Sequence, residues 1–499
     1  MGRFGHYSDI TSPHELQLPS AMRSKHTEAA VAVAGTSHDP TNNVEQQHGF
    51  HASATRIREE KALVKKQDVR ILPLSALCYL ILNLDRSNIG NAKTMNATTH
   101  NDLLSETHMS DRGYTISLMI YLIIYALAEV PSNYLLKMFA PSTWIAFLMF
   151  SWGAITIGIA GVQSYATVAV TRFLLGLFEA GLFPAIVYHI TFWYRAEERS
   201  LRIALIIASA TLASAFGGAI AFGVGHMNGV SGLAGFRWLF IFEGVPTCLA
   251  SLLIYFCFPD YPETSKWLTE DEKTIAKLRL ECSQSSVRLT WKDFKDVSMT
   301  WRLYVHYAIY FGVCCPFSSL AFFTPTITAG LGFKGLQSQL MTVPPYAVAY
   351  VVMVTVSWSA DRFDARALHS AALATAGACG FIASATLPLH AYKSRYACLV
   401  VATSGAFSCI PPLLGWLSAN LHSSAHVGVA IALNIAWGTP GQILGVWIYK
   451  KSEQQRGYPT GHWTNAGLLI FVAIACLSLR FYYRVLNQRN QNVAKVFIY

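Results

Sequence analysis

Four ionisable residues lie inside stretches that are otherwise as apolar as lipid-embedded helices. Asp85 and Arg86 are in one stretch, and Arg172 and Glu179 are in another. A charge at the centre of a bilayer costs at least ~2.5–3.5 kcal/mol, so these groups need an internal cavity. A carboxyl group can carry a proton, and a guanidinium can hold an anion. The pattern predicts a membrane transporter that moves an anion together with a proton.

The first pair belongs to the run LDRSNIGNA at 84–92. Adjacent helical residues point about 100° apart, so Asp85 and Arg86 cannot share one helix face. We expect one to line the cavity centre and the other to face a neighbouring helix or the cavity edge. Asn88 adds hydrogen-bonding groups and is a candidate substrate ligand. The alternative is a helix end at the interface with snorkelling charges.

The second pair has a spacing that puts both charges on one helix face. Arg172, Gly176 and Glu179 stand at i, i+4 and i+7, so the two charges lie roughly 10 Å apart along the axis. This separation is too great for a direct contact along one straight helix. Each charge must therefore find its partner on another helix or on a ligand. The alternative is a structural ion-pair network that holds the bundle shut in one state.

The composition is that of a membrane protein. Of 499 residues, 53% are hydrophobic and 13% are charged, whereas soluble chains average about 25% charged residues. Crossing ~30 Å of hydrocarbon takes about 20 helical residues. Twelve such spans are predicted, with cores at 71–94, 114–136, 143–162, 166–188, 201–224, 238–258, 303–326, 340–359, 367–387, 396–417, 427–448 and 463–483.

The net charge of +10 follows from topology and does not indicate nucleic-acid binding. Lys and Arg concentrate in segments that the positive-inside rule assigns to the cytoplasm, so both termini are predicted to be cytoplasmic. The ten cysteines have no spacing typical of a disulfide framework, and no Cys/His cluster has zinc spacing. No metal, cofactor or enzymatic nucleophile/base constellation is predicted.

The spans divide six and six around a long polar segment. We predict a disordered cytoplasmic tail at 1–70, a six-helix bundle at 71–259, a cytoplasmic linker with a short helix at 260–301, a second bundle at 302–485 and a short tail at 486–499. Within the first tail, disorder is expected through residue 54. Residues 55–70 are either an amphipathic helix at the membrane surface or a solvated linker.

These motifs resemble a known family. The run from Arg172 to Gly181 looks like the fourth-helix motif of the major facilitator superfamily. Together with LDRSNIGNA it resembles the anion:cation symporter family, and more narrowly its fungal allantoate/nicotinate permease branch. Further similar stretches, within 70–485, are GLFEAGLFPAIVYHITFWYRAEER (176–199), AFGGAIAFGV (215–224), FRWLFIFEGVP (236–246), FPDYPETSKWLTEDEK (258–273) and LMTVPPY (340–346).

The resemblance implies two six-helix bundles around a central site, and it implies roles for the four charges. Asp85 and Glu179 would be proton-linked carboxylates. Arg86 and Arg172 would be cationic partners of substrate or of those carboxylates. The chain departs from the branch at 438–442, GTPGQ, where the branch resembles Gly-Asn-Leu-Gly-Gly. Pro440 should kink that helix. If this face contacts the ligand, the substrate can differ from those of the best-known members of the branch.

Several weaker signals concern gating and helix ends. Asp361, Arg362 and Arg366 resemble a facilitator loop motif whose charges latch helix ends, and we predict a structural gate. Its counterpart in the first half keeps only Lys137, with Glu129 one or two turns inside. Two further residues are expected to be structural: Glu243, pairing with loop charges or helix ends, and His189, at the membrane interface.

Tyr310 and Ser318 are predicted to face the cavity from the seventh span, where aromatic and hydroxyl groups orient small ligands. Pro316 should break that helix locally. Asn96-Ala97-Thr98 matches an N-glycosylation acceptor in the first exterior loop.

The sequence as a whole predicts an all-α membrane protein that works as a monomer in the lipid bilayer, and the fungal resemblance implies the plasma membrane. Its predicted function is proton-coupled symport of a small organic anion, a carboxylate such as a vitamin or a ureido acid, by alternating access. The alternatives are a metabolite exporter of the same fold and a non-transporting nutrient sensor.

Overall fold

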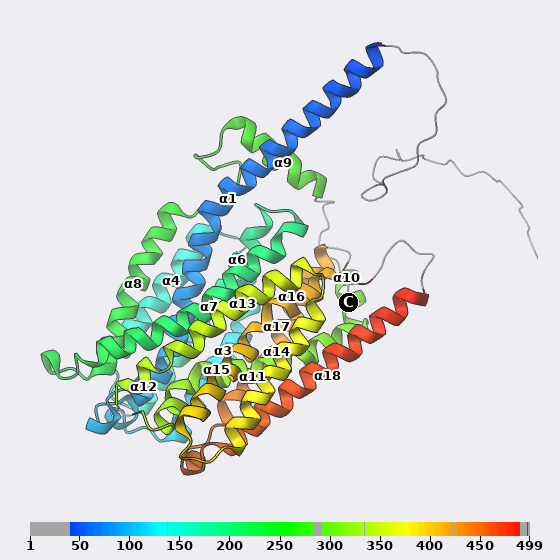
Figure 1. Ribbon diagram of the computed structural model, residues 1–499. Helices are drawn as coiled ribbons and strands as arrows, with labels where there is room; N and C mark the ends of the chain where they lie inside the picture. The colour runs from blue at the N-terminus through cyan, green and yellow to red at the C-terminus, as the bar shows by residue number, and fades with distance from the viewer. Residues whose placement is uncertain are drawn as a thin grey trace, which may run out of the picture. The chain divides into compact units, whose positions relative to one another are not determined.

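The computed structural model describes residues 40–136, 138–283, 291–333, 335–421, 424–489 and 497. The chain divides into two units, Met1–Arg58 and Glu59–Tyr499, and the account below concerns the second. The predicted all-helical membrane fold with two six-helix bundles is confirmed (Figure 1).

The N-terminal half contains the first six spans. Its helices are α1 (Pro40–Thr94), α2 (Leu103–Glu106), α3 (Asp111–Leu136), α4 (Pro141–Ile159), α5 (Tyr165–Glu179), α6 (Leu182–Thr191), α7 (Ala196–Gly225) and α8 (Gly235–Cys257). Short 3-10 turns occupy Ala97–Thr99 and Val230–Gly232. Helix α4 packs along α8, and α3 packs along α5.

The linker and the C-terminal half follow. The linker holds α9 (Glu270–Ser283) and α10 (Trp291–Ser298). The second half holds α11 (Trp301–Gly330), α12 (Gln337–Leu340), α13 (Val343–Arg362), α14 (Arg366–Thr386), α15 (Tyr392–Ser408), α16 (Ile410–Ala419), α17 (Ser424–Trp447) and α18 (Pro459–Arg489), with a 3-10 turn at Lys451–Arg456. The two halves meet where α13 packs on α7 and α17 on α3.

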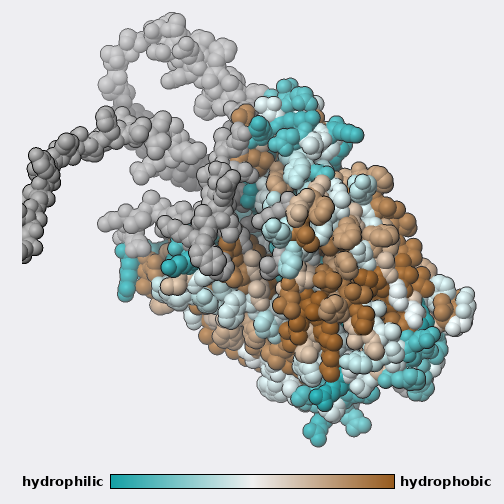
Figure 2. All heavy atoms as spheres, turned by 180° about the vertical axis from the view of Figure 1, so that it is seen from behind, coloured by the Kyte–Doolittle hydropathy of each residue, from teal (hydrophilic) through white to brown (hydrophobic). Residues whose placement is uncertain are grey.

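Hydrophobic side chains cover the middle of the face drawn in Figure 2, between hydrophilic ends. Eleven helical segments of the described chain are long and apolar enough to cross a membrane. Helix α3 is not among them, but its 26 residues exceed the length that a span needs. Each of the twelve predicted span cores falls on a helix or on a broken pair of helices.

Two spans are broken where proline removes a backbone donor. The fourth span stops as α5 at Glu179 and resumes as α6 at Leu182, just before Pro184. The tenth span changes from α15 to α16 at Cys409, before the adjacent prolines at 411–412. Helix α11, by contrast, runs unbroken through Pro316, so the break predicted there is absent.

Helix α1 begins at Pro40, so residues 40–70 are helical where the sequence predicted disorder through residue 54. Contacts of side chains after residue 58 stabilise the second part of this helix. Lys66 Nζ bonds Glu272 of α9 at 2.7 Å, and Asp68 receives two hydrogen bonds from Arg202, at 2.7 and 2.8 Å. Helix α9 thus lies beside α1 (Figure 1). We call this side of the bundle the linker end.

Glu272 also closes a capping box at the start of α9, because it accepts from the Thr269 amide at 2.9 Å while its own amide donates to the Thr269 hydroxyl. Burial raises the pKa of Glu272, but hydrogen bonds from Lys66 and Thr269 outweigh burial, and the pKa lies below its ordinary value. The linker helix is therefore held to α1 most firmly above the ordinary titration range of glutamate.

Candidate substrate and proton site

A hydrogen-bond chain connects two of the predicted charges through a tyrosine. Arg86 Nε donates to the Tyr121 hydroxyl at 2.8 Å, and that hydroxyl donates to Glu179 Oε2 at 2.5 Å. Tyr121 and Glu179 are fully buried, and Arg86 is half-buried. The second oxygen of Glu179 has no hydrogen-bond partner. The chain joins a cation that can meet a ligand to a carboxyl that can carry a proton.

Gly176 explains why this chain can form. A Cβ at Gly176 would lie 2.6 Å from the Tyr121 carbonyl oxygen, so only glycine lets α3 approach α5 this closely. The close approach brings the Tyr121 hydroxyl to Glu179, one turn further along the same face. The helix then ends at Glu179. The glycine between the two predicted charges thus positions the tyrosine that joins one of them to Arg86.

Arg86 faces the junction between the halves. Its guanidinium lies over the rings of Tyr121 and Tyr125, at 5.2 and 4.7 Å. Across the junction, Cys314 of α11 interacts electrostatically with Arg86 and contacts Tyr310. Arg86 is therefore the arginine that the C-terminal half approaches through Cys314, and Tyr310 contacts the same cysteine.

Arg172 differs from the prediction, because it lies inside the N-terminal half. Its side chain is 2% exposed, and its Nε has no partner. Its guanidinium lies 6.0 Å from the Phe240 ring of α8 and interacts electrostatically with Glu179 and Asp85. Arg172 and Arg86 were predicted to have the same role, but in this conformer Arg86 lies at the junction and Arg172 does not.

Asp85 also points into the N-terminal half, as expected for a residue about 100° from Arg86. Its Oδ2 accepts from the Trp152 indole at 3.0 Å and from the Thr247 hydroxyl at 3.4 Å. Its Oδ1 is buried without a partner. Asp85 is therefore held among α1, α4 and α8, away from the junction of the halves.

The remaining predicted ligands are already engaged in packing. The Ser318 hydroxyl donates to the Gln442 carbonyl at 3.0 Å, which joins α11 to α17 and leaves Ser318 no free donor for a ligand. The Asn88 amide oxygen accepts from Asn91 at 3.3 Å, and its nitrogen is buried without a partner. Gln442, from the divergent GTPGQ segment, contacts Cys314 near Arg86.

The end of the bundle opposite the linker is closed by contacts between the halves. Asp111 of α3 pairs with Lys93 at 3.0 Å and with Lys451, from the C-terminal half, at 2.8 Å. Gln339 of α12 donates to the Thr94 hydroxyl at 2.7 Å. At the linker end, ion pairs between described residues stay within one half or join the N-terminal half to α9.

The sequence profile of the Major Facilitator Superfamily matches residues 75–446. The chain belongs to the major facilitator superfamily. It is 63% identical to MFS transporter prlL of a fungus (Fungal sp., strain NRRL 50135), over 86% of this chain and 88% of that protein. It is 30% identical to a protein of Agrobacterium vitis named provisionally as a tartrate transporter, over 84% of this chain and 92% of that protein.

Solved structures agree with this fold. A bacterial homologue of the human lysosomal transporter Spinster, inward-facing and unoccupied, aligns with a TM-score of 0.64 at 14% identity, over 83% of this chain and 97% of that one. The xylose transporter XylE of E. coli, partially occluded and inward-open, aligns with a TM-score of 0.62 at 13% identity, over 82% and 97%. The family match and the transporter relatives identify a membrane transporter of the facilitator type, and these solved structures share its fold.

The predicted gate of this facilitator is formed in part. Arg366 Nε donates to Asp361 at 2.9 Å, whereas Arg362 is exposed and pairs with no residue in the described ranges. Lys137, in the counterpart motif, lies outside the described residues. Glu129 of that motif interacts electrostatically with Arg86, so it belongs near the central site.

Two sequence-based assignments are corrected by burial. Glu243 was expected to pair with loop charges or helix ends, but it is buried on α8 with both carboxyl oxygens unpartnered. His189 was expected at the interface; its side chain is fully buried in the protein, and its Nε2 donates to the Pro259 carbonyl oxygen at 2.5 Å. Hydropathy places a residue along a span but does not say which helices cover it.

The predicted glycosylation site is also engaged in packing. The Asn96 side-chain nitrogen donates to the Gly225 carbonyl at 3.2 Å, and its side-chain oxygen is buried without a partner. A glycan on that nitrogen would leave it one N–H for this hydrogen bond. Glycosylation at Asn96 stays a prediction.

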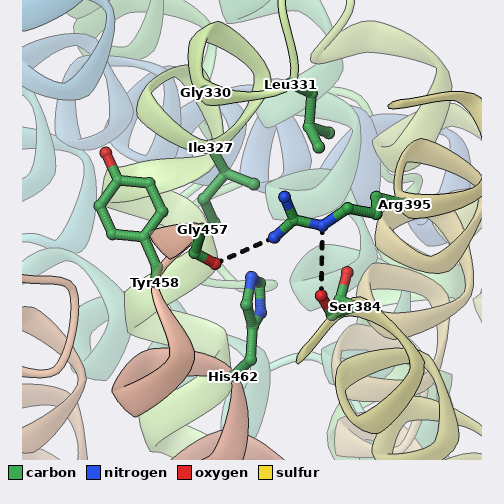
Figure 3. A pocket seen from close by; sticks show the side chains of 8 residues that line it. All are labelled: Ile327, Gly330, Leu331, Ser384, Arg395, Gly457, Tyr458 and His462. Atoms are coloured by element: carbon green, nitrogen blue, oxygen red, sulfur yellow. Dashed lines mark hydrogen bonds between the residues drawn. The ribbon is translucent and has the colours of Figure 1, made fainter. Parts of the chain in front are cut away.

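A small pocket in the C-terminal half of the facilitator contains another buried arginine (Figure 3). Arg395 donates to the carbonyl oxygens of Ser384 and Gly457, at 3.2 and 3.0 Å, and His462 lies nearby in the pocket. These bonds tie α15 to α14 and to the loop before α18. Arg395 therefore serves packing, which distinguishes it from Arg172, whose Nε has no hydrogen-bond partner.

The sequence reasoning missed the uncharged partners of the site. Tyr121 and Tyr125 lie at i and i+4 on the face of α3 that also carries Glu129, and that spacing was a usable signal for the two tyrosines. Trp152 and Thr247 offered no comparable signal, because one aromatic or one hydroxyl residue in an apolar span is ordinary.

Proposed function

We propose that this facilitator belongs to the anion:cation symporter family and couples inward proton movement to the uptake of a small organic anion. The observation that carries the proposal is the buried chain from Arg86 through Tyr121 to Glu179. It joins a candidate anion ligand to a candidate proton carrier within two hydrogen bonds.

The anion site would be centred on Arg86. A guanidinium offers a planar fork that matches a carboxylate, and the tyrosine rings around Arg86 keep it oriented. Tyr310 and Gln442 would contact the substrate from the C-terminal half. The relative named provisionally as a tartrate transporter supports a carboxylate as the substrate class.

The proton site would be Glu179. An ionised Glu179 attracts the positive charge of Arg86 through Tyr121 and competes with a bound anion for it. A proton on Glu179 removes this competition, and Arg86 then holds the anion more firmly. Proton and anion would therefore bind cooperatively, as symport requires.

Alternating access would release the proton and the anion on the linker side. The conformer described here is closed at the opposite end by Asp111, Lys93 and Lys451. If the termini are cytoplasmic, as charge distribution predicts, this end faces outward. A membrane potential then contributes ~2.3 kcal/mol per charge per 100 mV to accumulation.

The test is uptake of labelled nicotinate, allantoate, pantothenate, galactonate and tartrate into cells that lack their own permeases, at acidic and at slightly alkaline external pH. Accumulation that is stronger at acidic pH and is abolished by a protonophore would support symport. Arg86→Ala at equal surface expression is the matched control, and it should not accumulate the anion. Efflux of a preloaded compound without uptake would instead indicate an exporter, and no transport by a surface-expressed protein would indicate a sensor.

A further inference from the structure

Glu243 is the most unusual buried group that the central site does not use. It lies on α8, 4% exposed, and neither of its carboxyl oxygens has a hydrogen-bond partner. An ionised carboxylate buried without a partner costs several kcal/mol. Glu243 is therefore stable in this place only when it carries a proton or shares one.

The neighbours of Glu243 on α8 define where it points. Phe240, one turn before, lies over Arg172, and Thr247, one turn after, donates to Asp85 at 3.4 Å. Residues three and four apart share a helix face, so Glu243 faces the space between Arg172 and Asp85.

Few charged groups surround Glu243. Asp85 on α1 is the charged group that interacts electrostatically with Glu243. Arg172 and Glu179 on α5 are next, and both interact with Asp85. Helix α4 contributes the neutral Trp152. Cys248 of α8 also interacts electrostatically with Asp85. Helix α7 carries Arg202, which lies at the linker end and pairs with Asp68.

The charge balance of this cluster calls for bound protons. Asp85, Glu129, Glu179 and Glu243 face two cations, Arg86 and Arg172, so full ionisation would leave two uncompensated negative charges inside the membrane. One proton held by Asp85 and Glu243 leaves that pair with a single negative charge. This charge balances Arg172, while Glu179 balances Arg86.

We propose that Asp85 and Glu243 form a second proton-binding site, separate from the chain of Arg86, Tyr121 and Glu179. The inference rests on the proposed function, because it adds a site to the same proton-coupled cycle. The pair binds a proton inside the N-terminal half, among α1, α4 and α8, and not at the junction where the anion would bind. Its proton is thus carried without contact with the substrate.

Infrared spectroscopy of the purified protein in lipid, without substrate, tests this site. The wild type should show the carbonyl stretch of a protonated carboxylic acid at neutral pH, with the shift expected in D2O. Glu243→Gln should remove that band. Glu263→Gln is the control, because Glu263 is exposed, and it should leave the band unchanged. Absence of the band in the wild type, or its full survival in Glu243→Gln, would overturn the proposal.

A second variant guards against misfolding of the first. Asp85→Asn should keep the Glu243 band but shift its frequency, since the shared proton loses one acceptor. An unchanged band in a folded Asp85→Asn protein would contradict the pairing. In transport, Glu243→Gln should move one proton fewer per anion. The infrared result stands whether or not the wild type proves to be a symporter, so the two proposals fail separately.

Discussion

The two halves of this transporter treat buried polar groups differently. In the N-terminal half, Arg172, Asp85 and Glu243 each keep at least one buried polar atom without a partner. In the C-terminal half, the corresponding polar cluster is neutral and satisfied. Asn465 donates to the Ser319 hydroxyl at 2.9 Å and to the Tyr449 hydroxyl at 3.4 Å, and its oxygen accepts from Cys315 at 3.6 Å.

A satisfied neutral network rigidifies a bundle, whereas unpartnered charge has a free-energy cost that persists only where function requires it. Among the described residues, the buried acids lie in the N-terminal half, and the C-terminal half buries Arg395, with bonds to two carbonyls. We therefore expect proton and charge handling in the first half and a supporting, ligand-orienting role for the second.

Arg86→Ala is the substitution with the largest expected effect in this comparison. Loss of the guanidinium should lower anion binding by between about 10- and 100-fold, because a hydrogen bond to a charged group contributes about 1.5–3 kcal/mol. Binding to the protein in detergent, by calorimetry with the anion found in the uptake panel, measures the effect. The control is Ser318→Ala in the other half, whose hydroxyl is bonded to a carbonyl. A larger loss in Ser318→Ala would reverse the assignment of the two halves.

Glu179→Gln separates coupling from binding. Glutamine can still accept the hydrogen bond from Tyr121 but cannot carry a proton. Exchange of labelled for unlabelled anion should therefore continue, whereas pH-driven accumulation should be lost. Counterflow and net uptake in proteoliposomes measure the two properties on one preparation. Full accumulation by this variant would exclude Glu179 as the coupling carboxyl.

The fold and the identity of the charged residues could be predicted from sequence. Span length and hydropathy are set by the bilayer, and charges inside such spans are rare enough to stand out. The family motif also identified the two helices that carry these charges. Asp85, Arg86, Arg172 and Glu179 do come together in one half, as their placement on two spans suggested.

The roles of these residues could not be predicted in the same way. Spacing along one helix gives relative directions, but not which direction faces the other half, so Arg86 and Arg172 were equivalent until packing was known. Glu243 was expected to pair with loop charges or helix ends, because the sequence does not show which helices surround it. Tyr121 needed the close approach that Gly176 allows between α3 and α5, which is a tertiary property.

Asn465→Ala tests the second half of the comparison with a smaller effect on transport. The substitution removes the hydrogen bonds from Asn465 to the Ser319 and Tyr449 hydroxyls, which keep Pro316 and His462 as partners. Each lost hydrogen bond costs about 0.5–1.5 kcal/mol. Thermal stability in detergent should fall, while the protons moved per anion should stay unchanged. A change in coupling without a loss of stability would show that the C-terminal half also handles charge.

The smallest expected effect is at Asp111, Lys93 and Lys451, the one cluster of ion pairs among the described residues to which both halves contribute. Lys451→Ala removes the link from the C-terminal half to Asp111, but Asp111 keeps Lys93 as its partner. Lys451 is also largely exposed, and exposed pairs contribute about 0–1 kcal/mol. The population closed at the end opposite the linker should therefore fall by no more than about fivefold. Labelling of a cysteine introduced at that end measures closure, and Lys450→Ala, at the exposed neighbouring position, is the control. A much larger opening would mean that charge also governs the contact between the halves, and the division into a charged half and a neutral half would then be too simple.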